Sequence, residues 1–219
     1  MTSYVILLIH RNPHRMFKNV LLVLYTMLLW ILTCPVDAAQ VDSTFIKSVD
    51  EAYQKGEISR DSALEAYYSQ ALTAFDNYDF GISRRLLDYY ESLLAENDSI
   101  EQANSKLLYA QMLMEEGERA DAIEYLSESL SIYKSLKDSS KYMLVLLKLG
   151  HNYNYIGDHI GAREYYNDCI EIAHELNNLV VEGSCLYNIG GTYADDENYE
   201  KGFDFYNRAI ALANESLDK

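Results

Sequence analysis

The stretch LLKLGHNYNYIGDHIGAREYY, residues 146–166, decides the fold. Its large apolar residues Leu146, Leu149 and Tyr153 recur at spacings of three and four, which place them on one face of an α-helix. A glycine and an aspartate then interrupt the pattern, and a second apolar face begins at Ala162. The stretch therefore predicts two helices joined by a short turn.

Two other segments share this register at intervals of forty residues: LLYAQMLMEEGERADAIEYL (107–126) and LYNIGGTYADDENYEKGFDFY (186–206). A weaker copy, DNYDFGISRRLL (76–87), mirrors ENYEKGFDFYNR (197–208). In each strong copy small residues alternate with large ones, so that helix axes can approach closely while the large side chains fill the gaps. These expected packing positions are Ala110, Leu113, Ala122, Gly150, Tyr153, Ala162, Tyr166, Gly190, Tyr193, Gly202 and Tyr206.

The expected helix ends carry capping residues. Ser62-x-x-Glu65 and Ser99-x-x-Gln102 fit the capping-box pattern at a helix start, and Asn177-Asn178 stands where a helix should stop. No strand-like alternation competes with the helical periodicity, so we expect an all-α fold. The 20 tyrosines suit half-buried seams between helices, because the ring packs while the hydroxyl reaches water.

This pattern resembles the tetratricopeptide repeat. The family's marks stand here as Leu146, Leu149-Gly150, Tyr153, Ala162, Tyr166 and Cys169. The period of forty departs from the usual ~34 residues, and polar linkers such as KDSSK (137–141) replace the proline at repeat ends. The resemblance implies a right-handed superhelical solenoid of helical hairpins whose first helices line a concave groove. It divides the chain into a capping helix or linker (41–60), a degenerate repeat (61–98) and three further repeats (103–138, 143–178 and 183–217).

The first 39 residues have the pattern of a secretory signal peptide. Basic residues precede the apolar run VLLVLYTMLLWIL (20–32), and small residues follow at Ala38 and Ala39. Thirteen apolar residues are short for a membrane span, which needs about 20, although an uncleaved anchor is the alternative. Met16 is an alternative start. We therefore expect an exported protein of the periplasm or cell envelope, with membrane contact only through residues 20–32 if they are retained.

The charge excludes one class of partner. Lys and Arg number 18 against 34 Asp and Glu, a formal net charge of −16. Such a surface repels phosphate backbones, so nucleic-acid binding is not expected. Beyond the leader the chain has two cysteines, Cys169 and Cys185. An oxidising compartment allows one disulfide between them, and the alternative is a pair of small buried apolar residues.

No set of catalytic residues stands out. His151, His159 and His174 do not have the spacing of three or four that a helical metal site uses, and no phosphate, dinucleotide or nucleophile motif is present. We expect no enzyme, no metal and no cofactor.

The resemblance implies protein or peptide binding on the exposed face of each first helix. Carried over copy by copy, the groove positions are Gln111, Met114, Lys148, His151, Asn154, Tyr155, Tyr187 and Asn188. The alternative is that these are ordinary exposed residues. Two functions follow: a free-standing exported scaffold, or the periplasmic sensory region of a bacterial signalling protein (a sensor kinase, cyclase or DNA-binding regulator) with its membrane and output domains elsewhere. The resemblance supports the second function, because exported, tyrosine-rich repeats of about forty residues are frequent in that architecture. The segment NRAIALANESLDK (207–219) has no capping helix after it, so we expect either self-association through this last helix or a truncated sequence.

Overall fold

The computed structural model describes residues 38–217, and this part of the chain is helical without any strand. The expected leader lies outside the described residues, apart from its last two alanines. The helices are α3 (Ala38–Gln54), α4 (Arg60–Asp76), α5 (Phe80–Ser92), α6 (Ser99–Glu116), α7 (Arg119–Leu136), α8 (Ser139–Tyr155), α9 (His159–Glu175), α10 (Leu179–Asp195) and α11 (Tyr199–Leu217). The all-α prediction is confirmed.

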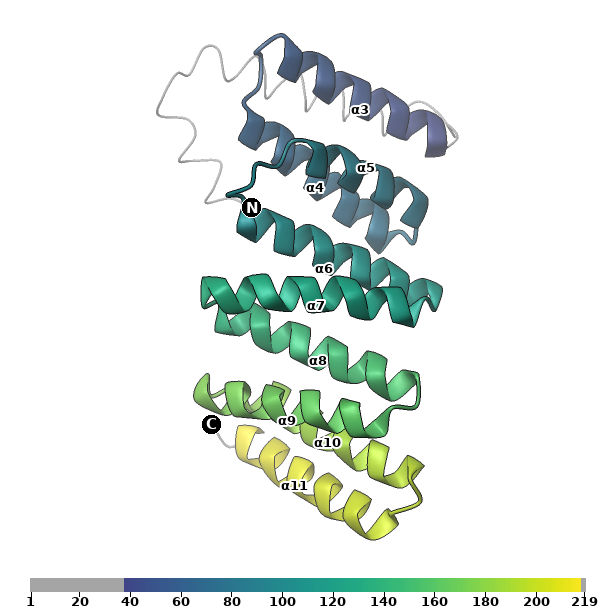
Figure 1. Cartoon of the computed structure of the whole chain (residues 1–219), viewed down its shortest axis with the longest axis vertical. Coiled ribbons are helices and arrows are strands. Elements are labelled where there is room, and N and C mark those ends of the chain that lie inside the picture. The colour runs from purple at the N-terminus through teal and green to yellow at the C-terminus, as the bar shows by residue number, and fades with distance from the viewer. Residues whose placement is uncertain (1–37, 218–219) are drawn as a thin grey trace.

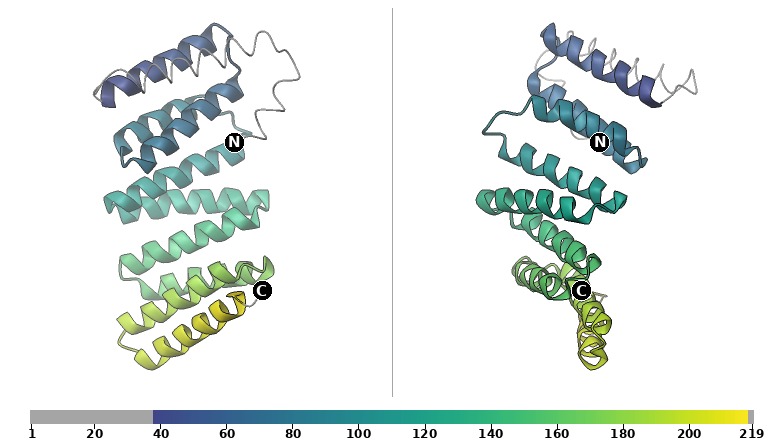
Figure 2. Two further views of the ribbon diagram at one scale, coloured as in Figure 1. Left: turned by 180° about the vertical axis from the view of Figure 1, so that it is seen from behind. Right: turned by 45° about the vertical axis from the view of Figure 1, so that its right-hand side comes forward.

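The helices pair into hairpins that stack in chain order from α3 to α11 (Figure 1). The helices of each pair, α4–α5, α6–α7, α8–α9 and α10–α11, pack against each other, and α3 packs on α4 and α5 at one end. First helices of neighbouring hairpins also contact each other directly at two junctions, α4 with α6 and α8 with α10. We call the side of the stack formed by the first helices α6, α8 and α10 the wall. The helix axes change direction along the stack, as two further views show (Figure 2).

Polar caps recur every twenty residues and fix where helices begin. The side chains of Asp138, Asp158 and Asn178 accept hydrogen bonds from the backbone N–H three residues further on, at 2.9, 2.9 and 3.1 Å. Each bond satisfies one of the N–H groups that a helix start leaves unpaired. The chain thus carries an independent start signal at each of three successive helices.

Both predicted capping boxes are wrong, because the cap residues in the structure lie three residues and one residue earlier in the sequence. Ser62 lies inside α4, whose cap is Ser59, and the Ser59 hydroxyl accepts from the Ser62 N–H at 3.1 Å. Ser99 is the first residue of α6, whose cap is Asp98. The predicted stop is confirmed, because Asn177 follows α9 in the left-handed region with φ 53°. Asparagine adopts that region more readily than most residues.

The small residues of the repeat are points of close helix contact. Gly150 of α8 lies against the ring of Tyr166 on α9, and a Cβ at Gly150 would come within 2.5 Å of that ring. Gly190 of α10 meets Tyr206 of α11 in the same way, at 2.8 Å. At both glycines the two helices of a hairpin are therefore too close for a Cβ without movement of the facing tyrosine. Ala110, Ala122 and Ala162 are fully buried, whereas Leu113, Tyr153, Tyr193 and Tyr206 are only partly buried.

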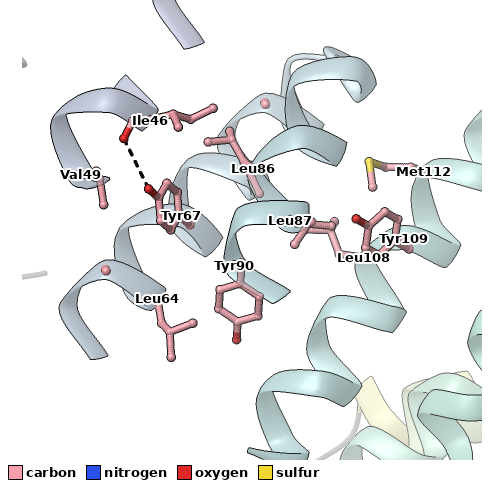
Figure 3. Close-up of a cluster of buried hydrophobic side chains, with 13 residues drawn as sticks. Ile46, Val49, Leu64, Tyr67, Leu86, Leu87, Tyr90, Leu108, Tyr109 and Met112 are labelled. Atoms are coloured by element: carbon pink, nitrogen blue, oxygen red, sulfur yellow. Dashed lines mark hydrogen bonds between the residues drawn. The ribbon is translucent and has the colours of Figure 1, made fainter. Parts of the chain in front are cut away.

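Tyrosines fill much of the core as well as its seams. Tyr67, Tyr133 and Tyr166 are at most 1% exposed. The Tyr67 hydroxyl reaches back to α3, where it donates to Asp50 at 2.6 Å and lies 3.4 Å from the Ile46 carbonyl (Figure 3). Burial, followed by the bond to Asp50, raises the pKa of Tyr67. Burying the ring while pairing the hydroxyl avoids the cost of an unsatisfied polar group.

Candidate functional site

The expected groove positions fall on the first helices of three hairpins, and two of them bond to each other. His151 of α8 and Asn188 of α10 share a hydrogen bond of 3.0 Å between the imidazole Nε2 and the amide nitrogen. The His151 ring also meets Tyr166 edge to face, with centroids 5.7 Å apart. This bond ties neighbouring first helices across the wall and keeps both side chains oriented.

Lys148 lies one turn before His151 on the same face of α8. Desolvation lowers the pKa of Lys148, and the nearby Glu115 carboxylate partly opposes this. Desolvation and the Lys148 charge both lower the pKa of His151. Both effects favour the neutral form of the His151 imidazole, which lies beside the Lys148 ammonium.

Asn154 follows one turn after His151 and carries an unused acceptor. Its Oδ1 is buried, and no hydrogen-bond donor reaches it within residues 38–217. Native structures rarely leave buried acceptors unpaired. Next to it, Tyr155 is 70% exposed, and the Arg119 guanidinium lies 4.0 Å from the centre of its ring. Tyr155 and Arg119 line an open depression of about 480 Å³ between the α6–α7 turn and the end of α8.

The remaining expected positions are more dispersed. Tyr187 of α10 is 62% exposed, and its ring contacts Tyr206 of α11 at 5.2 Å between centroids. Gln111 and Met114 are half-buried on α6, and Met114 packs against the apolar cluster that contains Ala110. Met114 is therefore partly a core residue.

One polar contact between hairpins was not predicted from the sequence. Asp196, just after α10, accepts hydrogen bonds from His159 and Arg163 of α9, both at 2.6 Å. The Arg163 guanidinium also lies 4.5 Å from the centre of the Tyr193 ring. The bonds to His159 and Arg163, in that order, lower the pKa of Asp196.

Sequence spacing offers a signal for such contacts. His151–Asn188 and His159–Asp196 are both 37 residues apart, which is the repeat period less about one helical turn. Both pairs join complementary polar side chains at the same offset, which the structure and not the repeat period alone determines.

Metal clusters and membrane-spanning helices are both absent from the described residues. No group of three His, Cys, Asp or Glu side chains within residues 38–217 is placed to hold a metal ion. None of the described helices combines the length and apolar character that crossing a bilayer requires.

Two family models of the tetratricopeptide repeat match the sequence, one at residues 101–175 and the other at residues 183–216. The chain is a tetratricopeptide repeat protein. Tetratricopeptide repeat domains commonly bind protein partners and are usually non-catalytic, although some are parts of enzymes. No curated protein matches the sequence.

Solved structures share the fold of this tetratricopeptide repeat protein at low identity. BtubC (BKLC) from P. vanneervenii is 17% identical with a TM-score of 0.69, over 83% of this chain and 75% of that one. A signal transduction ATPase with a tetratricopeptide repeat sensor, from Pyrococcus horikoshii, is 19% identical with a TM-score of 0.67, over 76% of this chain and 26% of that one. The apo form of RapI is 15% identical with a TM-score of 0.68, over 79% of this chain and 64% of that one.

Proposed function

We propose that this protein is a non-catalytic interaction module that binds a peptide or protein segment along the wall formed by α6, α8 and α10. The observation that carries the proposal is the exposed hydrogen bond between His151 and Asn188, which holds two polar side chains of neighbouring first helices in a fixed orientation. The remaining amide and imidazole groups can pair with a peptide backbone, since each peptide residue other than proline offers one N–H and one carbonyl.

The neighbouring groups suit the same ligand. Lys148 supplies a partly desolvated cation for a carboxylate or carbonyl. Tyr155 and Tyr187, 70% and 62% exposed, supply rings on which apolar side chains can pack. Exposed tyrosines flanking oriented amides are typical of surfaces that bind protein segments.

A library of random 12-residue peptides displayed on phage tests the proposal with the full chain. Selected peptides should bind the wild-type protein and lose about fivefold to tenfold in affinity with Asn188→Ala, the effect of one to two lost hydrogen bonds. Asn167→Ala, an exposed asparagine on α9, is the matched control and should bind as wild type. Failure to enrich any peptide, or equal binding by both variants, would contradict the proposal.

A second candidate function is the sensory region of a signalling protein. The likeness to the Pyrococcus horikoshii protein, whose repeats form a sensor, supports it. The test is to read the genomic DNA beyond codon 219. An in-frame membrane helix and output domain would establish this function, whereas an immediate stop codon would favour the free-standing scaffold.

We also propose export to the periplasm or cell envelope. The support is the basic segment, the apolar run 20–32 and the small residues at 38 and 39. Material recovered from the envelope fraction should begin near Ala39 or Gln40 by N-terminal sequencing. Intact chain in the cytoplasm would overturn the proposal.

The outer face of α11 supports self-association. Tyr199, Phe203 and Ile210 are 60%, 65% and 58% exposed. On the same helix Tyr206 is only partly buried, whereas Tyr166, the equivalent residue one repeat earlier, is fully buried. Exposed apolar stripes of this kind mark interaction surfaces. Light scattering of the full chain at micromolar concentration should detect dimers or larger species, and a clean monomer would refute this proposal.

A further inference from the structure

Cys169 and Cys185 meet in the core between two hairpins. Cys169 lies on α9 and Cys185 on α10, the two helices pack against each other, and both side chains are fully buried. They belong to one apolar cluster with Tyr166. The Cys169 thiol donates to the Met143 carbonyl at 3.5 Å, and the Cys185 thiol shares a hydrogen bond with Cys169. Both are free thiols in this structure.

We propose that Cys169 and Cys185 form a redox-modification site, in which a low-molecular-weight disulfide oxidises the pair to a bond between α9 and α10. One cysteine thiolate attacks the small disulfide, forming a mixed disulfide and releasing one small thiol. The second cysteine then attacks the bound sulfur, which closes the protein disulfide and releases the second small thiol. Two protein thiols are oxidised, one small disulfide is reduced to two thiols, and the two protons go to the released thiolates.

The placement of the pair determines what the bond does. It closes a short loop, residues 169–185, across the junction between the third and fourth hairpins. Constraining such a loop removes conformational freedom from the unfolded chain. The bond would therefore fasten α10 and α11, which carry Asn188 and the exposed face of α11, to the rest of the stack.

Burial also sets the rate. The hydrogen bond that the Cys185 thiol donates to Cys169, followed by desolvation, raises the pKa of Cys185, so little thiolate is present at neutral pH and a closed junction reacts slowly. Oxidation then requires a brief separation of α10 from α9. Local opening of this kind is an ordinary motion of folded proteins.

The experiment uses the full chain in a Cys34→Ser background, which leaves Cys169 and Cys185 as the only thiols. Folded protein is incubated with oxidised glutathione, quenched with acid and digested under non-reducing conditions. Mass spectrometry should detect a peptide pair linked through 169 and 185, and the midpoint of thermal unfolding should rise by roughly 5 °C or more. Reduction with dithiothreitol should reverse both effects. A Cys34→Ser, Cys185→Ala variant controls for oxidation elsewhere and should show neither.

Glutathione adducts alone, a link that forms only in urea, or a linked protein with an unchanged or lower midpoint would each overturn the proposal. The readout does not involve peptide binding, so its failure and that of the proposed groove are distinguishable.

Discussion

Replacing Gly150 with alanine tests whether the close packing of α8 on α9 requires a residue without a Cβ at this position. An added Cβ would lie 2.5 Å from Cε1 and 2.6 Å from Cδ1 of Tyr166, whereas carbon atoms pack best at about 3.5–4.0 Å. The Tyr166 side chain is fully buried, so the ring cannot swing into solvent to make room.

The expected cost follows from two opposing effects. Overpacking a core costs about 1–3 kcal/mol, and so close an approach belongs at the upper end of that range. Alanine regains about 1 kcal/mol over glycine within a helix. The free energy of unfolding should therefore fall by about 2 kcal/mol. With a urea dependence of about 2 kcal/mol per molar, the midpoint followed by circular dichroism at 222 nm should fall by about 1 M.

Gly183→Ala is the matched control on α10, because the nearest atom to its new Cβ would be Leu212 Cδ2 at 3.9 Å. It should stabilise the protein by up to about 1 kcal/mol. In a Tyr166→Leu background, Gly150→Ala should lose most of its penalty, since the clashing ring is gone. If Gly150→Ala is as stable as wild type, or if its penalty persists without the ring, the reasoning is refuted.

Three further substitutions test other contacts. Tyr67→Phe removes the donor to Asp50 and should lower the free energy of unfolding by about 1–2 kcal/mol in urea titrations, while an unchanged midpoint would show that the bond contributes nothing. Asp196→Asn should be less stable than wild type near pH 6. The bond to His159 lowers the folded-state pKa of Asp196. The wild-type advantage therefore exists above the ordinary aspartate pKa of about 4 and is lost as pH falls through the folded-state value. A stability difference that does not shrink on acidification would contradict this assignment. Phe203→Ser should weaken self-association about tenfold or more by sedimentation, and unchanged association would place the contact elsewhere.

The fold was predictable because its determinants lie within one repeat. The forty-residue register places Gly150 sixteen residues before Tyr166 in one hairpin and Gly190 sixteen before Tyr206 in the next, and the structure confirms both contacts. The helix starts were harder, since serine and aspartate candidates stand close together: Ser62 fits the capping pattern, but Ser59 is the cap.

The candidate site was predictable only in outline. Register indicates which positions face the wall, but not which side chains bond across it. The partner of His151 depends on how far α10 slides along α8, and spacing within a single repeat does not determine this offset. The same holds for Asp196, whose partners lie on a helix of the preceding hairpin. Whether the wall positions bind a ligand stays a prediction.

Because the helix caps recur every twenty residues, a whole hairpin can be removed from this chain without loss of a helix start. Asp138 and Asn178 do the same work at the starts of α8 and α10. Excising residues 139–178 would join Asp138 directly to Leu179 and give α10 a new cap in the same position as the old one. Because the cap residues of successive hairpins are equivalent, a single in-frame duplication or deletion can add or remove a hairpin while every helix keeps a cap residue at its start. Its length is therefore free to vary in evolution while its local chemistry stays constant.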